Sequence, residues 1–223
     1  MNTDTGYPLD FPNLTVHRFP DLLILHSVQP LHCLSSAVVG GGMIDTQVIL
    51  NRHVDKHYDA RDPAEEMRAF AHRHGIEVPF VGLMTAVHLD EARAITRRAN
   101  GVTVAALITA GIRNATAAGL SLPYIHMPGT INIILLIDAS LSPAAMVNAA
   151  ITATEAKTAL LGECQIKTPD GNLATGTSTD ALVVACTGRS PSLAYAGPAT
   201  PVGWLIGCCV RQALKEALNA YQP

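Results

Sequence analysis

The sequence predicts an α+β fold, in which a β-rich N-terminal part precedes alternating strands and helices. A mixed sheet covered by helices, of the layered-sandwich kind, is expected. Three observations support this class. Apolar residues make up 48% of the 223 residues and charged residues only 15%, which allows a large core. Short β-branched runs fill the first fifty residues, and helix start signals then alternate with apolar runs of strand length. No linker or low-complexity tract interrupts the chain, so residues 1–223 are expected to form one domain.

The N-terminal part is expected to contain four strands, at residues 14–18, 22–26, 34–39 and 46–50. Pro20 and Asp21 supply one turn, and the triple glycine at 40–42 supplies another. Three consecutive glycines either make a wide turn or allow a ligand to approach bare backbone. Gly41 and Gly42 are therefore candidates for substrate contact.

The middle of the chain carries a strong helix start at Asp62, where a capping Asp is followed by Pro63 and by Glu65. This helix should end at His74, before Gly75. A strand is expected at 81–87. A short helix capped by Asp90 and ended by Gly101 should follow, and then a buried strand at 102–110.

The last part of the chain is expected to alternate strand and helix. Strands are predicted at 133–138 and 181–186, where apolar residues run continuously. Ser142 and Pro143 start the strongest helix, at 143–161, whose many alanines permit close packing on a sheet. The final helix should span 201–221, because its apolar residues recur at helical spacing.

Composition excludes several classes of function. A formal net charge of −3 gives no case for nucleic-acid binding, and the apolar runs at 131–137 and 202–210 fall short of the roughly 20 residues of a membrane span. Five cysteines without framework spacing, and an N-terminus without a signal pattern, predict reduced thiols in a cytoplasmic protein. The high apolar content is compatible with a homodimer. The paired histidines at 53 and 57, and at 72 and 74, have no third ligand at metal-site spacing, so no metal site is expected.

The most informative stretch is 173–188, where a hydroxyl-rich segment closed by Asp180 leads into the strand at 181–186. Thr177, Ser178 and Thr179 precede the carboxylate, and a rigid strand would present all four at its leading end. Hydroxyls beside a carboxylate suit a site that binds or hydrolyses a polar group. The alternative is a tight turn in which these side chains bond to their own backbone.

Two more small polar segments follow or precede strands, at 109–119 and 128–132, and Glu155 lies on the alanine-rich helix. No local motif of a common mechanism is present. The residue types allow hydrolysis in which Asp180 or Glu155 activates water or a hydroxyl of Thr177 or Ser178. Thr109, Asn114 and backbone amides would then hold the carbonyl oxygen.

An ordered set of segments resembles the adenosylcobinamide amidohydrolase (CbiZ) family. The segments are Leu-Ser-Ser-Ala at 34–37, the glycines at 40–42, Asn-Arg-His-Val at 51–54, Gly-Leu-Met-Thr-Ala-Val at 82–87, Thr-Ala-Gly at 109–111, Asn-Ala at 114–115, Gly-Thr-Ile-Asn at 129–132, Thr-Glu-Ala-Lys at 154–157, Ala-Thr-Gly-Thr-Ser-Thr-Asp at 174–180 and Tyr-Ala-Gly-Pro at 195–198. They cover nearly the whole chain. The resemblance implies hydrolysis of the amide that joins aminopropanol to the corrin ring of adenosylcobinamide, giving adenosylcobyric acid and aminopropanol in cobamide (cobalamin) salvage.

The resemblance also implies a broad cleft for a wide, mostly apolar substrate fringed with amides. Cobalt would enter with this corrinoid substrate, so no cofactor of the protein's own is expected. The residues expected to bind the substrate are Gly41, Gly42, Asn51, Thr85, Asn114, Asn132, Thr179 and Tyr195. Tyr124, Tyr195 or Trp204 could lie against the ring or the adenosyl group. The alternatives are a corrinoid carrier without chemistry and a hydrolase for a different amide.

Overall fold

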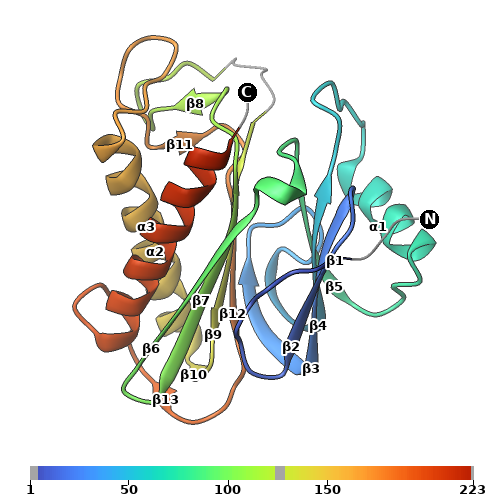
Figure 1. The fold of residues 1–223 in the computed structure, drawn as a ribbon, viewed down its shortest axis with the longest axis vertical. Coiled ribbons are helices and arrows are strands. Elements are labelled where there is room, and N and C mark those ends of the chain that lie inside the picture. Colours follow the sequence, from blue (N-terminus) through green and yellow to red (C-terminus); the bar gives the residue numbers. More distant parts are fainter. Residues whose placement is uncertain (1–4, 124–128, 222–223) are drawn as a thin grey trace.

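The computed structural model describes residues 5–123 and 129–221, and within them a nine-stranded mixed sheet is the central element (Figure 1). Its main path runs β1-β2-β3-β12-β9-β7-β6, and β4 and β5 branch from β3. The strands are β1 (Thr5–Gly6), β2 (Leu14–Arg18), β3 (Leu22–Ser35), β4 (Gly42–His53), β5 (Phe80–Thr85), β6 (Arg93–Ala99), β7 (Val102–Ala110), β9 (Ile131–Ile137) and β12 (Ala181–Cys186). The pairs β12–β9 and β4–β5 are parallel and the others antiparallel, so the predicted mixed sheet in an α+β fold is confirmed.

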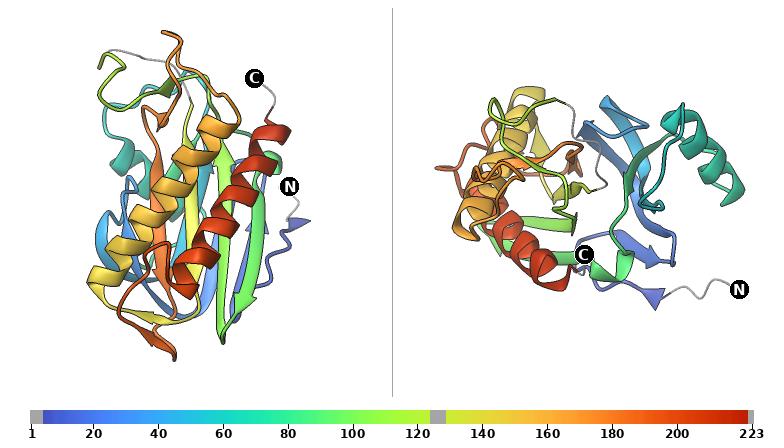
Figure 2. Two further views of the ribbon diagram at one scale, coloured as in Figure 1. Left: turned by 90° about the vertical axis from the view of Figure 1, so that its left-hand side faces the viewer. Right: turned by 90° about the horizontal axis from the view of Figure 1, so that it is seen from above.

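Helices cover the sheet on two sides. α2 (Pro143–Glu163) and α3 (Pro201–Ala220) lie side by side on one face of β12, β9, β7 and β6, and α1 (Pro63–Arg73) packs beside β4 and β5 (Figures 1 and 2). β3 connects the two halves of the sheet, because its first part pairs with β2 and its last part with β12, and its register with β4 shifts between His26 and Leu31. The two halves of the sheet share one apolar core between them, in which Leu25 and Ile49 of one half lie in the same cluster as Leu107 and Val183 of the other.

The helix start signals are confirmed by the observed caps. The Asp62 side chain accepts a hydrogen bond from Glu65 N, and the Ser142 side chain accepts one from Ala145 N. Each cap satisfies a backbone N–H that the first helical turn leaves without a partner. Thr200 caps α3 in the same way, through Gly203 N.

Two expected elements are wrong. The strand expected at 34–39 does not form, because β3 ends at Ser35 and the chain bends away. The helix expected between Asp90 and Gly101 is a short 3₁₀ turn, η1 (Leu89–Glu91), followed by β6. Asn100 and Gly101 have φ values of 51° and 76°, which makes the two-residue turn of a β-hairpin. Gly101 therefore closes a hairpin with β7 and does not end a helix.

Two short strand pairs mark the opposite ends of β9 and β12. At the end where both strands begin, β8 (Ala115–Thr116) pairs with β11 (Gly176–Thr177). At the end where both strands stop, β10 (Ser140–Leu141) pairs with β13 (Ser192–Leu193). No helix in residues 5–123 and 129–221 is long and apolar enough to cross a membrane. The hydroxyl-rich segment before β12 thus lies at the β8–β11 end.

Candidate functional site

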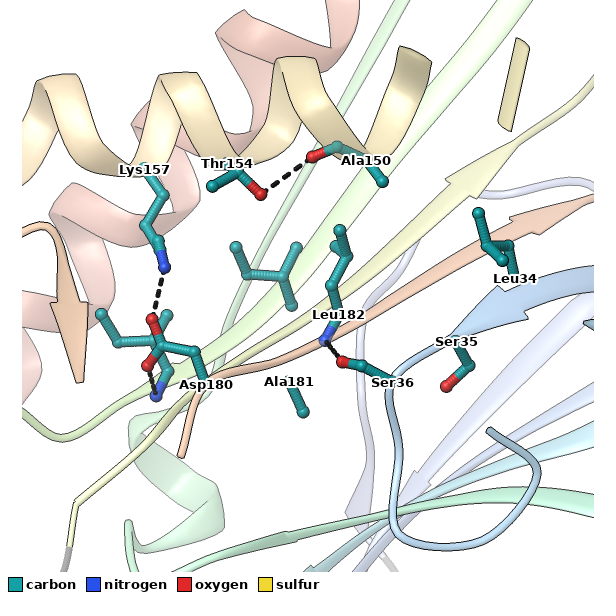
Figure 3. Close-up of a pocket in the computed structure, with 11 residues that line it drawn as sticks. Leu34, Ser35, Ser36, Ala150, Thr154, Lys157, Asp180, Ala181 and Leu182 are labelled. Carbon is teal, nitrogen blue, oxygen red and sulfur yellow. Dashed lines mark hydrogen bonds and ion pairs between the residues drawn. The ribbon is translucent and has the colours of Figure 1, made fainter. Parts of the chain in front are cut away.

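An ion pair between Lys157 of α2 and Asp180, the residue before β12, forms the centre of the candidate site (Figure 3). Lys157 Nζ donates to Asp180 Oδ2, and the two side chains are only 11% and 19% exposed. Lys157 reaches this position because it shares the buried face of α2 with Ala153 and Leu160 at helical spacing. Gly176 makes room for the pair, since a Cβ there would collide with Asp180 Oδ2 and lie 2.7 Å from Lys157 Nζ.

The other carboxylate oxygen of Asp180 holds the hydroxyl-rich segment in place. Asp180 Oδ1 accepts hydrogen bonds from Ile131 N and Thr177 N, both at 3.1 Å, and from the Thr177 hydroxyl. Bonds of this kind are stronger than neutral ones, because the acceptor is ionised. The Thr177 hydroxyl therefore donates directly to a carboxylate that can accept its proton, which is the arrangement of a hydroxyl nucleophile with its base.

Asn114 organises the neighbouring hydroxyls. Its Nδ2 donates to Ser178 Oγ at 2.7 Å and to Gly129 O at 2.6 Å, and the Thr179 hydroxyl donates to the same Gly129 carbonyl at 2.7 Å. Asn114 is fully buried, and its Oδ1 has no hydrogen-bond partner among the residues that the structure describes. A Cβ at residue 129 would collide with this oxygen, so only glycine fits here. Asn114 thus ties Ser178 and Thr179 to the loop before β9.

A second polar cluster is sealed inside the protein next to the ion pair. Asn51 Nδ2 donates to Thr109 Oγ1 at 3.1 Å, and Asn132 Nδ2 donates to Asn51 Oδ1 at 2.9 Å and to the Met84 carbonyl at 2.7 Å. The Thr130 hydroxyl, 3.0 Å from Asn132 Oδ1, connects this network to the site loops. Asn51, Thr109 and Asn132 are at most 1% exposed. These neutral groups join β4, β7, β9 and β5, so the structure places them behind the site, out of reach of the cavities described next.

Two cavities meet at the ion pair, and both are lined by Thr154, Lys157 and Asp180. The first cavity, of about 350 Å³, lies between α2 and the strands β3 and β12 and is seen in Figure 3. The second, of about 730 Å³, lies between α2 and the segments around β8 and β11 and includes Thr177 and Ser178. Of the residues predicted for catalysis, the structure therefore brings Asp180, Thr177 and Ser178 together at open space.

Several other predicted site residues lie elsewhere. Glu155 is on the exposed side of α2 and lines neither cavity. Gly41 and Gly42 form the turn into β4, and Thr85 is buried, with its hydroxyl accepting from Val87 N. Among the aromatic candidates, Tyr195 follows β13 with 72% of its surface exposed, Trp204 on α3 is 60% exposed, and Tyr124 lies outside the described residues.

Lys157 is the one residue of this central cluster that is not among the residues expected from the sequence to form the site. A signal for it exists in the sequence, because Lys157 falls on the alanine and leucine stripe of α2 while Glu155 falls off that stripe. A lone lysine on a buried stripe needs a partner for its charge. The structure shows no group of three or more His, Cys, Asp or Glu side chains arranged to hold a metal within residues 5–123 and 129–221.

Comparisons with known proteins place the chain in one family. The fold is similar to the crystal structure of the PH0078 protein from Pyrococcus horikoshii, with a TM-score of 0.56 and 13% identity over 99% of this chain and 83% of that one. The adenosylcobinamide amidohydrolase of Methanosarcina mazei is 34% identical over 82% of this chain and 88% of its own length. That of Halobacterium salinarum is 37% identical over 62% of this chain and 58% of its own length. The family model for adenosylcobinamide amidohydrolase matches residues 11–223, and the chain therefore belongs to the adenosylcobinamide amidohydrolase family.

Proposed function

We propose that this protein hydrolyses the amide between aminopropanol and the corrin ring of adenosylcobinamide, releasing adenosylcobyric acid and aminopropanol for cobamide salvage. One observation carries the proposal beyond family membership. The Thr177 hydroxyl, the Asp180 carboxylate and the Lys157 ammonium form a connected unit where two cavities meet. In amide hydrolysis such a hydroxyl can serve as the nucleophile, the carboxylate as its base and the ammonium as a stabiliser of the developing oxyanion.

The first step is attack by the Thr177 hydroxyl. Its oxygen forms a bond to the carbonyl carbon of the substrate amide, and its proton passes to Asp180 Oδ1, to which it is already hydrogen-bonded. The carbon–nitrogen bond then breaks, and the aminopropanol nitrogen leaves with that proton. The corrin acid remains bound to Thr177 as an ester. Water cleaves this ester through the same base, which restores the hydroxyl and releases adenosylcobyric acid.

Lys157 supports both steps through its charge. An ammonium group carries three hydrogens, and Asp180 Oδ2 accepts one of them. The others can reach groups in the cavities that Lys157 lines, including a carbonyl oxygen on which negative charge develops. The cation also holds Asp180 in the orientation that presents Oδ1 to Thr177.

These steps use only side chains of this chain and water. We propose that cobalt arrives with the substrate and that no further cofactor takes part. Treatment of the protein with a chelator should then leave the rate of hydrolysis unchanged.

We also propose a cytoplasmic setting, since all five cysteines carry free thiols, as is usual in reducing compartments.

The test is incubation of the purified protein with adenosylcobinamide, followed by mass spectrometry of the corrinoid and of the released amine. A corrinoid with the mass of adenosylcobyric acid, together with free aminopropanol, is expected. Binding of the substrate without release of aminopropanol would replace the proposal with a corrinoid carrier. Release of amine from other linear amides, with adenosylcobinamide left intact, would replace it with a different amidase.

A further inference from the structure

The two cavities beside the Lys157–Asp180 pair have linings of different chemistry. The first is largely apolar, with Leu34, Ile131, Ile133, Ala150 and Leu182. The second has more hydroxyls, from Thr116, Ser121, Thr158, Thr175, Thr177 and Ser178, beside the apolar Ala117, Ala118, Leu122 and Pro123. The first cavity carries fewer hydroxyls, from Ser35, Ser36 and Thr154, so it suits an apolar group better than the second, which suits a group that makes hydrogen bonds.

Exposed apolar side chains extend the first cavity on both of its sides. On α2, Val147 and Ile151 are 49% and 50% exposed and lie close, in helical spacing, to the cavity residues Ala150 and Thr154. On the sheet, the cavity residue Leu34 is paired across the strands with Met43 of β4, which is 54% exposed and lies on the same face of the sheet as Leu34. Apolar side chains left uncovered beside a cavity are typical of a surface that a ligand covers.

The substrate of the proposed function has two unequal halves. The acyl half is a wide, mostly apolar ring fringed with amides, and the amine half is small and carries a hydroxyl. Both halves must be bound at once, with the scissile amide at Thr177 and Asp180. An apolar ring gains most by covering the apolar cavity and the exposed apolar side chains beside it. The hydroxyls of the second cavity mostly bond within the protein, but their remaining lone pairs can accept from the hydroxyl of the arm.

We propose that the substrate lies across the Lys157–Asp180 pair, with its ring on the apolar cavity and its aminopropanol arm in the hydroxyl-lined cavity. This orientation rests on the proposed function. It means that residues other than Thr177, Asp180 and Lys157 determine which substrate is recognised. Val147, Ile151 and Met43 are positioned to contact the outer part of the ring, because the first cavity alone is too small for a whole corrinoid. The second cavity has the larger volume, so the lining chemistry, and not the size, decides the orientation.

Three matched substitutions test the orientation. Ala150→Leu narrows the apolar cavity, and Ala118→Leu narrows the hydroxyl-lined cavity. Ala159→Leu makes the same change on an exposed position of α2 that lines neither cavity. Two ligands are compared. Binding of adenosylcobinamide is assessed from the KM of its hydrolysis, and binding of adenosylcobyric acid is measured as a Kd by calorimetric titration. The second ligand keeps the ring and lacks the aminopropanol arm.

Ala150→Leu is expected to raise both constants by a similar factor, on the order of tenfold, because an added side chain in a fitted pocket excludes the ring from its position. Ala118→Leu should raise the KM for adenosylcobinamide and leave the Kd for adenosylcobyric acid within about twofold, since this ligand has no arm to exclude. Ala159→Leu should change neither. Circular dichroism and thermal melting of each variant check that it is folded.

Two results would overturn the orientation. One is a Kd for adenosylcobyric acid that rises in Ala118→Leu and not in Ala150→Leu, which would place the ring in the hydroxyl-lined cavity. The other is a Kd that neither variant changes, or no binding of this ligand at all. Failure of the proposed function has a different signature, namely that the unsubstituted protein releases no aminopropanol. The Kd comparison is still decisive in that case, because it needs no turnover.

Discussion

The same three kinds of side chain meet at both ends of the parallel strands β9 and β12. Where the strands begin, Asp180 accepts from the Thr177 hydroxyl and pairs with Lys157. Where they stop, Asp138 accepts from the Thr187 hydroxyl at 2.8 Å and pairs with Arg189 at 2.7 Å. The two carboxylates are almost equally exposed, at 19% and 18% of their side-chain surface. Residue types and burial of the acid therefore do not distinguish the two clusters.

The clusters differ in their cations and in the space around them. Lys157 comes from a buried face of α2 and is 11% exposed, whereas Arg189 lies two residues after Thr187 on a surface loop and is 46% exposed. Asp180 and Lys157 line two cavities, and Asp138, Thr187 and Arg189 line neither of them. A partly exposed ion pair contributes little, but a desolvated cation at a cavity can act strongly on a bound group. Open space beside a buried charge therefore distinguishes the end proposed to be reactive, here called the reactive end, from the other end.

The largest expected effect tests the two carboxylates against each other. Asp180→Asn should lower kcat/KM for release of aminopropanol by about 100- to 10,000-fold, because it removes the base while keeping the shape. Asp138→Asn is the matched control and should stay within about twofold. Steady-state kinetics on folded variants measure both. Similar losses from the two substitutions would remove the distinction between the two ends.

The next prediction concerns the two threonines. Thr177→Ala should lower kcat by at least about 100-fold, and Thr177→Ser should retain much of the rate, because it keeps a hydroxyl in place beside Asp180. Thr187→Ala should leave kcat unchanged. A rapid-quench experiment followed by mass spectrometry should also detect the corrin ester on the Thr177 peptide. Full activity in Thr177→Ala would mean that water attacks the amide directly.

A smaller effect, on stability, is expected from the sealed amide network behind the reactive end. Asn132→Leu should lower the free energy of unfolding by about 2 kcal/mol or more, because it leaves the buried Asn51 Oδ1 and the Met84 carbonyl without this partner, at about 1–3 kcal/mol each.

Urea denaturation measures this effect, with Asn148→Leu on the surface-facing side of α2 as the control. A stability change below about 1 kcal/mol in Asn132→Leu would contradict a structural role for the network. Asn132 would then be better regarded as a group that contacts the substrate, as the sequence analysis expected.

The smallest effect, on the reactivity of thiols, is expected at the end of β12 away from the candidate site, where Cys186 precedes Thr187. Burial raises the pKa of the Cys186, Cys33 and Cys209 thiols to about 12. At pH 8 only about one in 10,000 of these thiols would be in the reactive thiolate form. A thiol-reactive disulfide reagent should therefore label the exposed Cys164 first and leave these three unmodified until the protein unfolds. Rapid labelling of Cys186 in the native protein would show that this end also opens.

Much of the fold could be predicted because its signals are local. The caps at Asp62 and Ser142 are formed by residues next to the helices they start, so the starts of α1 and α2 were predicted correctly. The strands β7 and β12 were predicted with their observed bounds, since both are continuous apolar runs. The alanines of segment 90–101 fit helical spacing and so predict a helix, but the chain forms β6 there and turns at Asn100 and Gly101 into β7.

The local part of the candidate site follows from the sequence for the same reason. Thr177, Ser178 and Asp180 are within four residues of one another, so their proximity follows from the sequence. Lys157 is 23 residues before Asp180 and meets it only because α2 packs across β12. Glu155 lies only two residues before Lys157, but each residue turns an α-helix by about 100°. Glu155 is therefore exposed while Lys157 is buried.

The sequence by itself therefore determined the family, the mixed sheet with its helices, and a hydroxyl-rich segment that ends in a carboxylate before a buried strand. The tertiary structure alone decided which polar groups are sealed and which face open space. Asn51, Thr109 and Asn132 carry the same kinds of polar atoms as Thr177 and Ser178, yet they satisfy one another inside the protein. The physical reason is that exposure and charge pairing depend on long-range packing between elements, which local patterns of residues do not specify.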